Sequence, residues 1–485
     1  CNTRRQKQLV LMKKYYNRIE FWIFIFFLIR MIGINNPPLE IGHNWRQITG
    51  LMVARNYLEV DANILYPRID DNNGETGIIG MEFPSLNYLY FLTSKLLGYT
   101  HWYGRLINLI ISSLGLFFFY KLIFLAGFKE RVAFVSTIFL SASIWFTFSR
   151  KMMPDTYCIS LMFIGLYYGL RFLKENKFYQ ILLYIIVCSL AVLSKIPAGI
   201  YFILLLPFVL NKKFNIRRRI ILISTSLIPL ILTYIWYFVW NPKLASEYGN
   251  WYNSGKPIKT GFIEIVENLG KTLDNFYFDS FSSYIVFSIF ISGVFIMFLK
   301  KDKRMIITFS LLFLVFVIYI FKSGFYFYHH NYYIIPFVPV MALVAGYALS
   351  LMKNKWVFIT ILILGVGESI ANQQHDLFVK KTEKYKMSIE PIMDSVSHTD
   401  DLILINGNGN PQLIYLSNRK GWNCSDEQLS DKAYINTVID NNCKFIVINK
   451  HSHADLETVN LLFKTVFEND DFLVVKTSTT AKTRS

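Results

Sequence analysis

The sequence predicts a mainly α-helical, polytopic transmembrane protein with a small soluble α/β domain at its C-terminal end. Charged residues make up 17% of the 485 residues and hydrophobic residues 53%, whereas soluble domains carry about a quarter charged residues. Long apolar runs, such as 220–237 and 284–299, approach the roughly 20 residues that a helix needs to cross the hydrocarbon core. After residue 371 the composition becomes that of a soluble protein.

The apolar runs predict about eleven membrane-spanning helices, because inside a bilayer each backbone polar group must be satisfied within its own segment. Together they form a transmembrane domain over residues 1–371, with large outer loops at 37–101 and 241–282. The predicted spans are 19–36, 102–126, 132–149, 155–173, 178–194, 196–211, 219–240, 283–299, 305–321, 333–351 and 355–371.

The basic residues predict the orientation. The formal net charge is +17, but the Lys and Arg residues lie in short clusters between apolar runs, not in one nucleic-acid-binding surface. Such clusters are typical of loops on the cytoplasmic side, and the loop 211–219 is the richest of them. We therefore expect an inner (cytoplasmic) membrane protein with a cytoplasmic N-terminus, an extracytoplasmic C-terminal domain and no nucleic-acid partner.

The outer segments have structure of their own. Within the loop 37–101 we expect two short helices, at 44–60 and 83–97, with a turn at 70–74 between them. Residues 372–485 are expected to form the α/β domain. Its three short apolar runs, 402–405, 445–448 and 472–475, predict strands.

Two details of that domain carry further expectations. Residues 406–409, Asn-Gly-Asn-Gly, follow a strand, but they lack the spacing of a dinucleotide-binding loop and predict a turn. Cys424 and Cys443 both lie in the domain. Since an extracytoplasmic compartment permits disulfides, we expect these two residues to form one.

Ionisable residues gather near the outer ends of the predicted spans. Transfer of a sugar from a lipid phosphate needs a carboxylate base, cations for the departing phosphate and an apolar groove for the lipid. Taken singly, each such residue is more often a solvated or snorkelling side chain. The candidates are Glu40, His43, Arg46, Glu82, Asp155, Lys195, His329 and His330.

The segments that hold these candidates resemble the C-type membrane glycosyltransferases (GT-C), in particular bacterial relatives of the lipid A aminoarabinose transferase and the PMT-like polyprenyl- or dolichyl-phosphate-mannose protein mannosyltransferases. The resemblance runs from about residue 19 to about residue 425 and rests on the shared order of short motifs. They include Trp45-Arg46-Gln47, Met153-Pro154-Asp155, Ser194-Lys195-Ile196-Pro197 and His329-His330-Asn331-Tyr332, with 53–57, 66–68, 82–88 and 412–422.

The resemblance implies an inverting transfer from a polyprenyl-phosphate sugar donor, on the extracytoplasmic side, to a glycolipid, polysaccharide or protein acceptor. It implies no cofactor, and a divalent metal at the two histidines stays open. By this resemblance the catalytic carboxylates are Glu40, Asp155 and Glu82, with Glu40 as base and Asp155 orienting the acceptor or a lysine. The resemblance also implies that the donor phosphate is bound by Lys195, Arg46 and one of His329 and His330. It implies that His43, Trp45 and Tyr332 support the acceptor or the loop.

One departure from the family pattern keeps other functions open. The family has an Asp early in the first outer loop, where this chain has Glu40, and Ile48-Thr49 stand where close relatives have a further Asp. The alternatives are a polymerase or ligase acting on lipid-linked sugars, a transporter or flippase, and a catalytically inactive relative. A transporter is expected to show paired repeats and charges near the midplane, and neither is evident in the sequence.

Overall fold

The computed structural model describes residues 18–40, 42–249, 255–452 and 463–477. The chain forms two compact units. The first, which we call the helical unit, comprises residues 1–34, 104–239 and 253–377. The second, the loop–tail unit, comprises residues 35–103, 240–252 and 378–485. The first outer loop thus belongs to the same compact unit as the C-terminal segment, which the sequence alone did not indicate.

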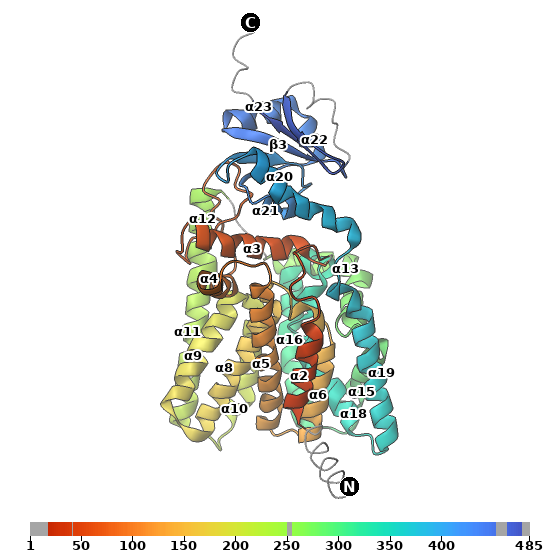
Figure 1. The fold of residues 1–485 in the computed structure, drawn as a ribbon. Helices are drawn as coiled ribbons and strands as arrows, with labels where there is room; N and C mark the ends of the chain where they lie inside the picture. The colour runs from red at the N-terminus through yellow and green to blue at the C-terminus, as the bar shows by residue number, and fades with distance from the viewer. Residues whose placement is uncertain (1–17, 41, 250–254, 453–462, 478–485) are drawn as a thin grey trace, which may run out of the picture. The chain divides into compact units, whose positions relative to one another are not determined.

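The helical unit is a bundle of apolar helices, several of which run side by side (Figure 1). Its longer helices are α2 (Ile19–Arg30), α5 (Tyr103–Leu125), α6 (Glu130–Ala142), α8 (Pro154–Glu175), α9 (Phe178–Ser194), α11 (Ile216–Tyr234), α15 (Tyr284–Leu299), α16 (Lys303–Ser323), α18 (Val338–Ser350) and α19 (Lys355–Gln373). Its shorter elements are α7 (Trp145–Phe148), η1 (Ile196–Leu205), α10 (Leu206–Leu210), η2 (Ile235–Trp240), α13 (Ile258–Glu267), α14 (Leu269–Asp274), η3 (Asn275–Asp279), α17 (Phe325–His329), η4 (Asn331–Ile334) and η5 (Gln374–Leu377).

Five helices in the described parts of the chain are long and apolar enough to cross a membrane, or six if one bent pair, Leu269–Asp279 with Tyr284–Leu299, counts as a span. The segments predicted as spans are helical over most of their length, but the count of about eleven spans stays a prediction. Segment 196–211 consists of the 3-10 helix η1 and the short α10. Pro197 and Pro207 lie at their starts, and proline cannot donate a backbone hydrogen bond.

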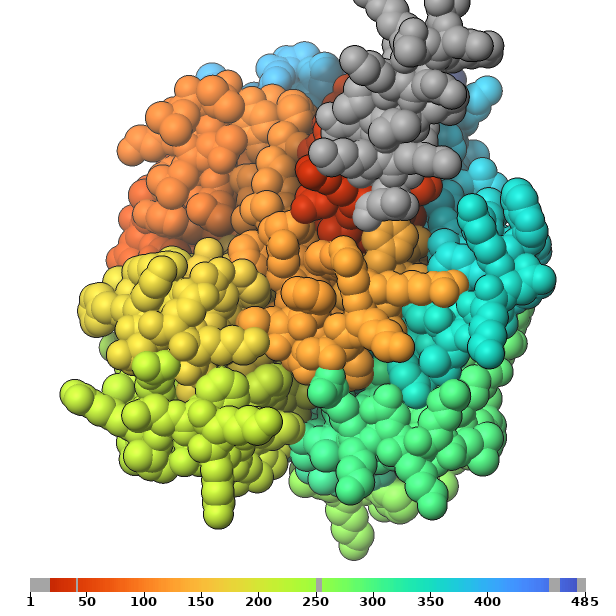
Figure 2. Space-filling view, turned by 90° about the horizontal axis from the view of Figure 1, so that it is seen from below, coloured from red at the N-terminus to blue at the C-terminus, as the bar shows by residue number. Residues whose placement is uncertain are grey.

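The loops predicted to be cytoplasmic contact one another at one end of the helical unit. Lys174 Nζ donates to the Leu125 carbonyl at 3.3 Å, and Arg131 donates to the Met352 carbonyl at 3.2 Å. Arg304 donates to the Gly127 carbonyl. Figure 2 views this face, where α5, the segment around α10 and α16 present their ends. These contacts put the described basic loops at the same end of the helical unit, which agrees with the predicted orientation.

The first outer loop contributes two helices to the loop–tail unit. α3 (Asn44–Glu59) and α4 (Ser85–Leu97) confirm the helices predicted at 44–60 and 83–97. The predicted turn between them is also confirmed, since Asn73 and Gly74 have φ angles of 52° and 76°. The segment 240–252 adds α12 (Asn241–Tyr248). The Asn241 side chain donates to the Met81 carbonyl at 3.0 Å and so holds this helix to the first loop.

The C-terminal segment contains a five-stranded sheet in the order β2-β1-β3-β5-β4. β1 (Leu402–Ile405) pairs in parallel with β2 (Gly421–Asn423) and β3 (Cys443–Asn449), and β5 (Phe472–Lys476) runs antiparallel to β3 and β4 (Lys464–Glu468). The three strands predicted from apolar runs are confirmed as β1, β3 and β5. The two missed strands lie at the ends of the strand order, and neither carries a continuous apolar run: β2 has only three residues, and β4 is largely exposed. The helices around the sheet are η6 (Lys381–Ser388), α20 (Ile389–Val396), α21 (Gln412–Leu416), α22 (Asp426–Ser430) and α23 (Lys432–Asp440).

The predicted disulfide between Cys424 and Cys443 is wrong, because both residues are free, buried thiols. Cys443 begins β3 opposite Leu402, at the start of β1, whereas Cys424 follows β2 beyond the end of β1. β1 lies between them, so the two residues are about two strand spacings, or roughly 10 Å, apart across the sheet as well as displaced along it. A disulfide needs Cα atoms within about 7 Å.

The first loop also docks on the sheet within the loop–tail unit. Asp71 forms a parallel bridge with Gly421. The Gly421 N–H donates to the Asp70 carbonyl at 3.1 Å, while its own carbonyl accepts from Asn72 and Asn73 at 3.0 and 2.9 Å. A Cβ at Gly421 would lie 2.0 Å from the Ile403 carbonyl oxygen, so this close approach requires glycine. The loop therefore extends the β2 edge of the sheet.

Candidate functional site

A buried ion pair forms the centre of the polar cluster in the helical unit. Asp155 lies in the first turn of α8, which Pro154 begins, and Lys195 is the extended residue after α9. Lys195 Nζ lies 2.5 Å from Asp155 Oδ1, and the side chains are 12% and 5% exposed. Lys195 therefore does not extend into lipid, because Asp155 holds it inside the protein.

Aromatic rings cover this ion pair. Lys195 Nζ lies 4.8 Å from the ring centroid of Tyr332 and 5.7 Å from that of Tyr333. The His330 ring stacks on Tyr332 at 5.2 Å between centroids. His329 turns instead to Phe325, with centroids 3.9 Å apart. Of the two predicted histidines, His330 therefore packs on the ring that faces Lys195.

The turn before Asp155 is held by a buried amide. Asn108 Nδ2 donates to the carbonyls of Phe148, Lys151 and Met153 at 3.1, 2.8 and 3.1 Å. Lys151 in turn lies 3.1 Å from Asp376. Sequence reasoning missed Asn108, although a lone Asn inside the apolar run 102–126 is a usable signal, because a buried amide must find hydrogen-bond partners.

The predicted residues of the first loop form pairs among themselves in the loop–tail unit. Glu40 is buried, and its Oε2 accepts a hydrogen bond from Gln47 Nε2 at 3.0 Å. Arg46, the predicted phosphate ligand, pairs with Glu82, the third candidate carboxylate. His43 precedes α3 with a φ of 56°, and the Trp45 side chain is 52% exposed. The start of α3 thus brings the buried Glu40 and the Arg46–Glu82 ion pair into one part of the loop–tail unit.

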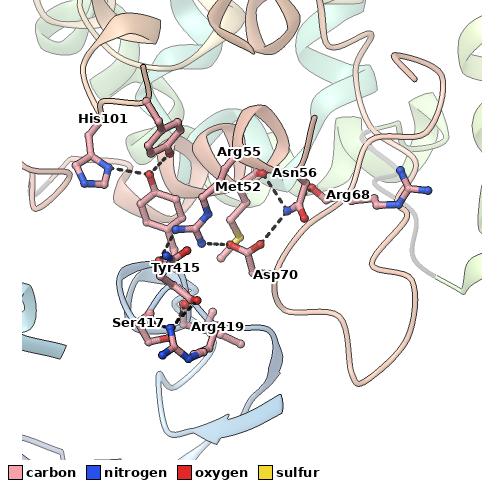
Figure 3. Close-up of polar contacts among 12 residues, drawn as sticks. Met52, Arg55, Asn56, Arg68, Asp70, His101, Tyr415, Ser417 and Arg419 are labelled. Atoms are coloured by element: carbon pink, nitrogen blue, oxygen red, sulfur yellow. Dashed lines mark hydrogen bonds and ion pairs between the residues drawn. The ribbon is translucent and has the colours of Figure 1, made fainter. Parts of the chain in front are cut away.

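A second buried network joins the first loop to the C-terminal segment of the same unit (Figure 3). Arg55 pairs with Asp70 at 2.6 Å, donates to the Tyr415 carbonyl at 3.0 Å and lies 4.3 Å above the Tyr415 ring. Asn56 Nδ2 donates to the second Asp70 oxygen at 2.8 Å. The Tyr415 hydroxyl forms a hydrogen bond of 2.8 Å with His101 Nδ1. Every charge in this network has a partner inside it, which indicates a structural role in joining loop and tail.

Burial also changes the pKa of Asp71, which lies where the first loop contacts the sheet. Asp71 Oδ1 accepts from the Asn423 N–H at 3.2 Å. Burial raises the pKa of Asp71 to about 6, against the opposing effect of the hydrogen bonds from Asn423. We therefore expect the stability of the contact between the first loop and the sheet to depend on pH.

An apolar cavity of about 370 Å³ lies inside the helical unit. Its walls come from α5, α8, η1 with α10, α16 and α18, and its lining includes Phe119, Leu166, Leu204, Leu312 and Leu343. The volume falls in the range of small-ligand cavities. Its apolar walls suit a hydrocarbon chain.

In the part of the chain that the structure describes, no three His, Cys, Asp or Glu side chains gather as a metal-ligand set. His451 pairs with Asp471 at 2.7 Å, and His453 lies outside the described residues.

Comparisons with known proteins find solved structures with a similar fold. The family model for dolichyl-phosphate-mannose-protein mannosyltransferase matches residues 82–238. The structure of ArnT from Cupriavidus metallidurans bound to undecaprenyl phosphate matches with a TM-score of 0.61 at 12% identity, over 95% of this chain and 98% of that chain.

The chain has the fold of the C-type membrane glycosyltransferases.

A second C-type structure agrees. The archaeal oligosaccharyltransferase AglB from Archaeoglobus fulgidus, in complex with an inhibitory peptide and a dolichol-phosphate, matches with a TM-score of 0.53 at 12% identity, over 92% of this chain and 72% of that chain. No curated protein sequence matches the chain at a significant level. The resemblance that the sequence motifs indicated is therefore confirmed at the level of the C-type fold, and the chain is a multi-pass membrane protein.

Proposed function

We propose that the protein transfers a sugar from a polyprenyl-phosphate donor to an acceptor hydroxyl on the extracytoplasmic side of the inner membrane, with inversion at the anomeric carbon. The observation that carries the proposal is the Lys195–Asp155 pair beneath Tyr332, at the end of the helical unit opposite the basic loops. ArnT, which shares the C-type fold, has been solved with undecaprenyl phosphate bound, and this supports a lipid phosphate as the donor's leaving group.

Lys195 is the proposed ligand of the donor phosphate. In surroundings of lowered dielectric a cation attracts a phosphate more strongly than in bulk water. Asp155 holds the ammonium in place, and the Tyr332 ring adds a cation–π contact at 4.8 Å. His330, stacked on Tyr332, supplies a second nitrogen donor. Asp155 is thus proposed as a positioning residue for Lys195.

Glu40 is the proposed base. Its carboxylate is buried, and Gln47 holds one of its oxygens, so its direction is set before substrate arrives. Arg46 is proposed as a second phosphate ligand. Because Glu82 pairs with Arg46, we assign Glu82 to positioning that arginine and not to proton abstraction.

The proposed reaction is a single displacement at the anomeric carbon that uses no cofactor. The acceptor hydroxyl oxygen forms a bond to the anomeric carbon, its proton passes to Glu40, and the bond from that carbon to the phosphate oxygen breaks. Polyprenyl phosphate leaves with the electron pair of that bond, and the developing charge on its phosphate is stabilised by Lys195 and Arg46. The apolar cavity of about 370 Å³ is proposed to take part of the prenyl chain.

The proposal is tested with undecaprenyl-phosphate esters of mannose and of aminoarabinose, incubated with purified protein and a cell-envelope glycolipid extract. Released undecaprenyl phosphate is measured by mass spectrometry. The variant carries Lys195→Met with Asp155→Asn, so that no buried charge is left without its partner. We expect release by the wild type and a loss of roughly 100- to 1,000-fold in the variant, the usual effect of removing a group that stabilises developing charge.

The matched control is Lys322→Met, since Lys322 lies in the last turn of α16, outside the cluster. It should keep full activity. A wild-type protein that neither releases nor binds undecaprenyl phosphate would contradict the proposal, and equal loss in both variants would remove Lys195 from the phosphate site.

A further inference from the structure

The sheet of the loop–tail unit has a crevice at a topological switch point. The chain leaves β1 at Ile405 and returns as β2 on one side of β1, and β3 then pairs on its other side. In open α/β sheets, ligands bind outside the carboxyl ends of the strands at such points. Here the loop after β1, which contains the turn 406–409, and the last residue of β3, Asn449, face this crevice.

A cavity of about 90 Å³ fills the crevice. A water molecule needs about 10–15 Å³ measured in this way, so the cavity has room for roughly six to nine water-sized groups. That is one edge of a single pyranose ring, and it is too little for a nucleotide. The polar side chains that line it are the amides of Asn406, Asn408, Asn410, Gln412 and Asn449, together with the ammonium of Lys386.

The cavity walls are built rigidly. Asn406 Nδ2 donates to Asp426 Oδ1 at 2.9 Å, and Asn406 Oδ1 accepts from the Asn449 N–H at 2.8 Å. Asn408 exchanges two hydrogen bonds with Asp426, each of 2.9 Å. These bonds fix the loop and the strand ends before any ligand binds, which lowers the entropy cost of binding.

Two side-chain amides of the cavity, those of Asn410 and Asn449, have N–H groups that the hydrogen bonds above do not use. Asn449 Oδ1 accepts from the Tyr385 hydroxyl and from the His451 N–H, both at 3.2 Å, so the orientation of its amide is set. Asn410 Oδ1 accepts from the Gln412 N–H at 3.1 Å. Within residues 18–40, 42–249, 255–452 and 463–477, no protein acceptor is seen for Nδ2 of Asn410 or of Asn449. Both Nδ2 groups can donate to a ligand.

The charge of the site indicates a neutral ligand. Lys386 Nζ lies 2.6 Å from Glu383 Oε2 and 2.8 Å from Gln412 Oε1. Its positive charge is therefore already balanced, and Asp426 adds a negative charge behind the loop. An anion such as phosphate meets no net positive charge here, whereas hydroxyl groups suit amide donors and acceptors.

We propose that this amide-lined cavity binds one neutral sugar residue. The identification of that sugar as part of the acceptor rests on the proposed function, whereas the binding itself does not. An acceptor glycan would then be held by the tail segment through a residue other than the one that reacts, and this contact would select glycan acceptors over lipids or peptides that lack sugar.

The test uses the full-length protein in detergent and three probes: the methyl glycosides of mannose, glucose and galactose. Binding is followed by saturation-transfer NMR. The variants are Lys386→Met, which removes the ammonium donor, and Asn410→Ser, which keeps an oxygen for the Gln412 N–H but removes the amide donor. The matched control is Lys384→Met, an exposed lysine of the same 3-10 helix, η6.

We expect at least one glycoside to bind the wild type and the control equally, with each variant weakening binding about tenfold, the effect of losing one hydrogen bond of this kind. Thermal melting identifies any variant that has lost its fold. No binding of any glycoside, equal binding by folded variants, or displacement of the glycoside by inorganic phosphate would overturn the proposal. Undecaprenyl phosphate binding in the same samples separates the two proposals, because it tests the donor site alone.

Discussion

Buried charges determine what single residues can do in this protein. Lys195 and Asp155 are nearly inaccessible, and removing one partner of such a pair typically costs about 3–5 kcal/mol, because the other charge stays buried without compensation. A loss of activity in Asp155→Asn alone would thus mix catalysis with stability. Changing both residues together isolates the loss of the cation.

Glu40→Gln tests the proposed base. The amide keeps the size of the side chain and an oxygen that can accept the Gln47 hydrogen bond, but it cannot take a proton. We expect turnover to fall on the order of a hundredfold or more, with the affinity for undecaprenyl phosphate unchanged, as measured by native mass spectrometry. The control is Glu75→Gln, an exposed acid of the same loop. Near-normal turnover in folded Glu40→Gln would move the base to Glu82 or His43.

The pH dependence of stability tests the environment of Asp71. Burial raises its pKa to about 6, so the folded protein holds this proton while the unfolded chain loses it near its ordinary value of about 4. The protonated carboxyl therefore makes its full contribution to the free energy of unfolding below about pH 4, and this contribution is lost as pH rises through about 6. A shift of about two units corresponds to about 3 kcal/mol at most.

Asp71→Asn should remove this part of the pH dependence and raise the thermal midpoint at pH 7.5 relative to the wild type. The measurement is the midpoint of each protein between pH 4 and pH 8. Asp440→Asn, an exposed position at the end of α23, serves as the control and should follow the wild-type curve. Parallel curves for all three proteins would show that Asp71 titrates normally.

At the scale of elements, the segment η1–α10 shows how proline shapes the helical unit. Pro197 and Pro207 fall at the starts of η1 and α10, where a missing N–H costs least. The resulting break places Lys195 on an irregular backbone at the end of α9, and it also makes one wall of the apolar cavity. Irregular backbone at membrane depth is tolerated only where it is buried in protein or lines a cavity, and this segment meets that condition.

Leu204→Trp tests whether the cavity holds the prenyl chain. Leu204 lines the cavity, and the larger indole would fill part of its volume. We expect binding of undecaprenyl phosphate to weaken about tenfold, because apolar area that the lipid would bury is already covered. Leu206→Trp is the matched control, since Leu206 is two residues away, 41% exposed and absent from the lining. Equal affinities for both variants would exclude this cavity as the lipid site.

In the helical unit as a whole, the predicted cytoplasmic loops gather at one end. The basic loops contact one another at one end. The chain leaves for the first loop at Ile34, beside Arg105 at 3.4 Å, and it leaves for the tail just after Asp376, beside Lys151. Lys151 belongs to the turn before α8, at the end away from the basic loops. The chain therefore leaves the helical unit after Ile34 and after Leu377 at the end opposite the basic loops.

Reporter fusions test the orientation that follows. A fluorescent protein that matures only in the cytoplasm should be dark when fused after Ser485, and alkaline phosphatase at that position should be active, because the positive-inside rule places the basic loops in the cytoplasm. The fluorescent protein inserted between Lys213 and Phe214, in the most basic loop, is the control and should be bright. The opposite pattern would invert the protein in the membrane.

Local pattern was enough to predict much of this molecule. Apolar runs predicted the helices, and short β-rich runs predicted β1, β3 and β5, because both depend on residues close together in the chain. The order of short motifs along the chain predicted the C-type fold. The residues at 70–74 predicted a turn, and the structure has positive φ angles at Asn73 and Gly74 within it. The candidate site residues were also found in this way, as residue types near the predicted span ends.

Only the tertiary structure decided which of those residues meet. Lys195 and Asp155 are 40 positions apart, and Arg55 and Tyr415 are 360 apart. No local pattern indicates that His330, and not His329, stacks on the Tyr332 ring that faces Lys195, or that β1 separates Cys424 from Cys443. The physical reason is that helix and strand formation depend on neighbours in sequence. Ion pairs, ring stacking and strand order depend instead on how whole helices and strands pack, and in a close-packed interior that packing depends on side chains from distant parts of the chain.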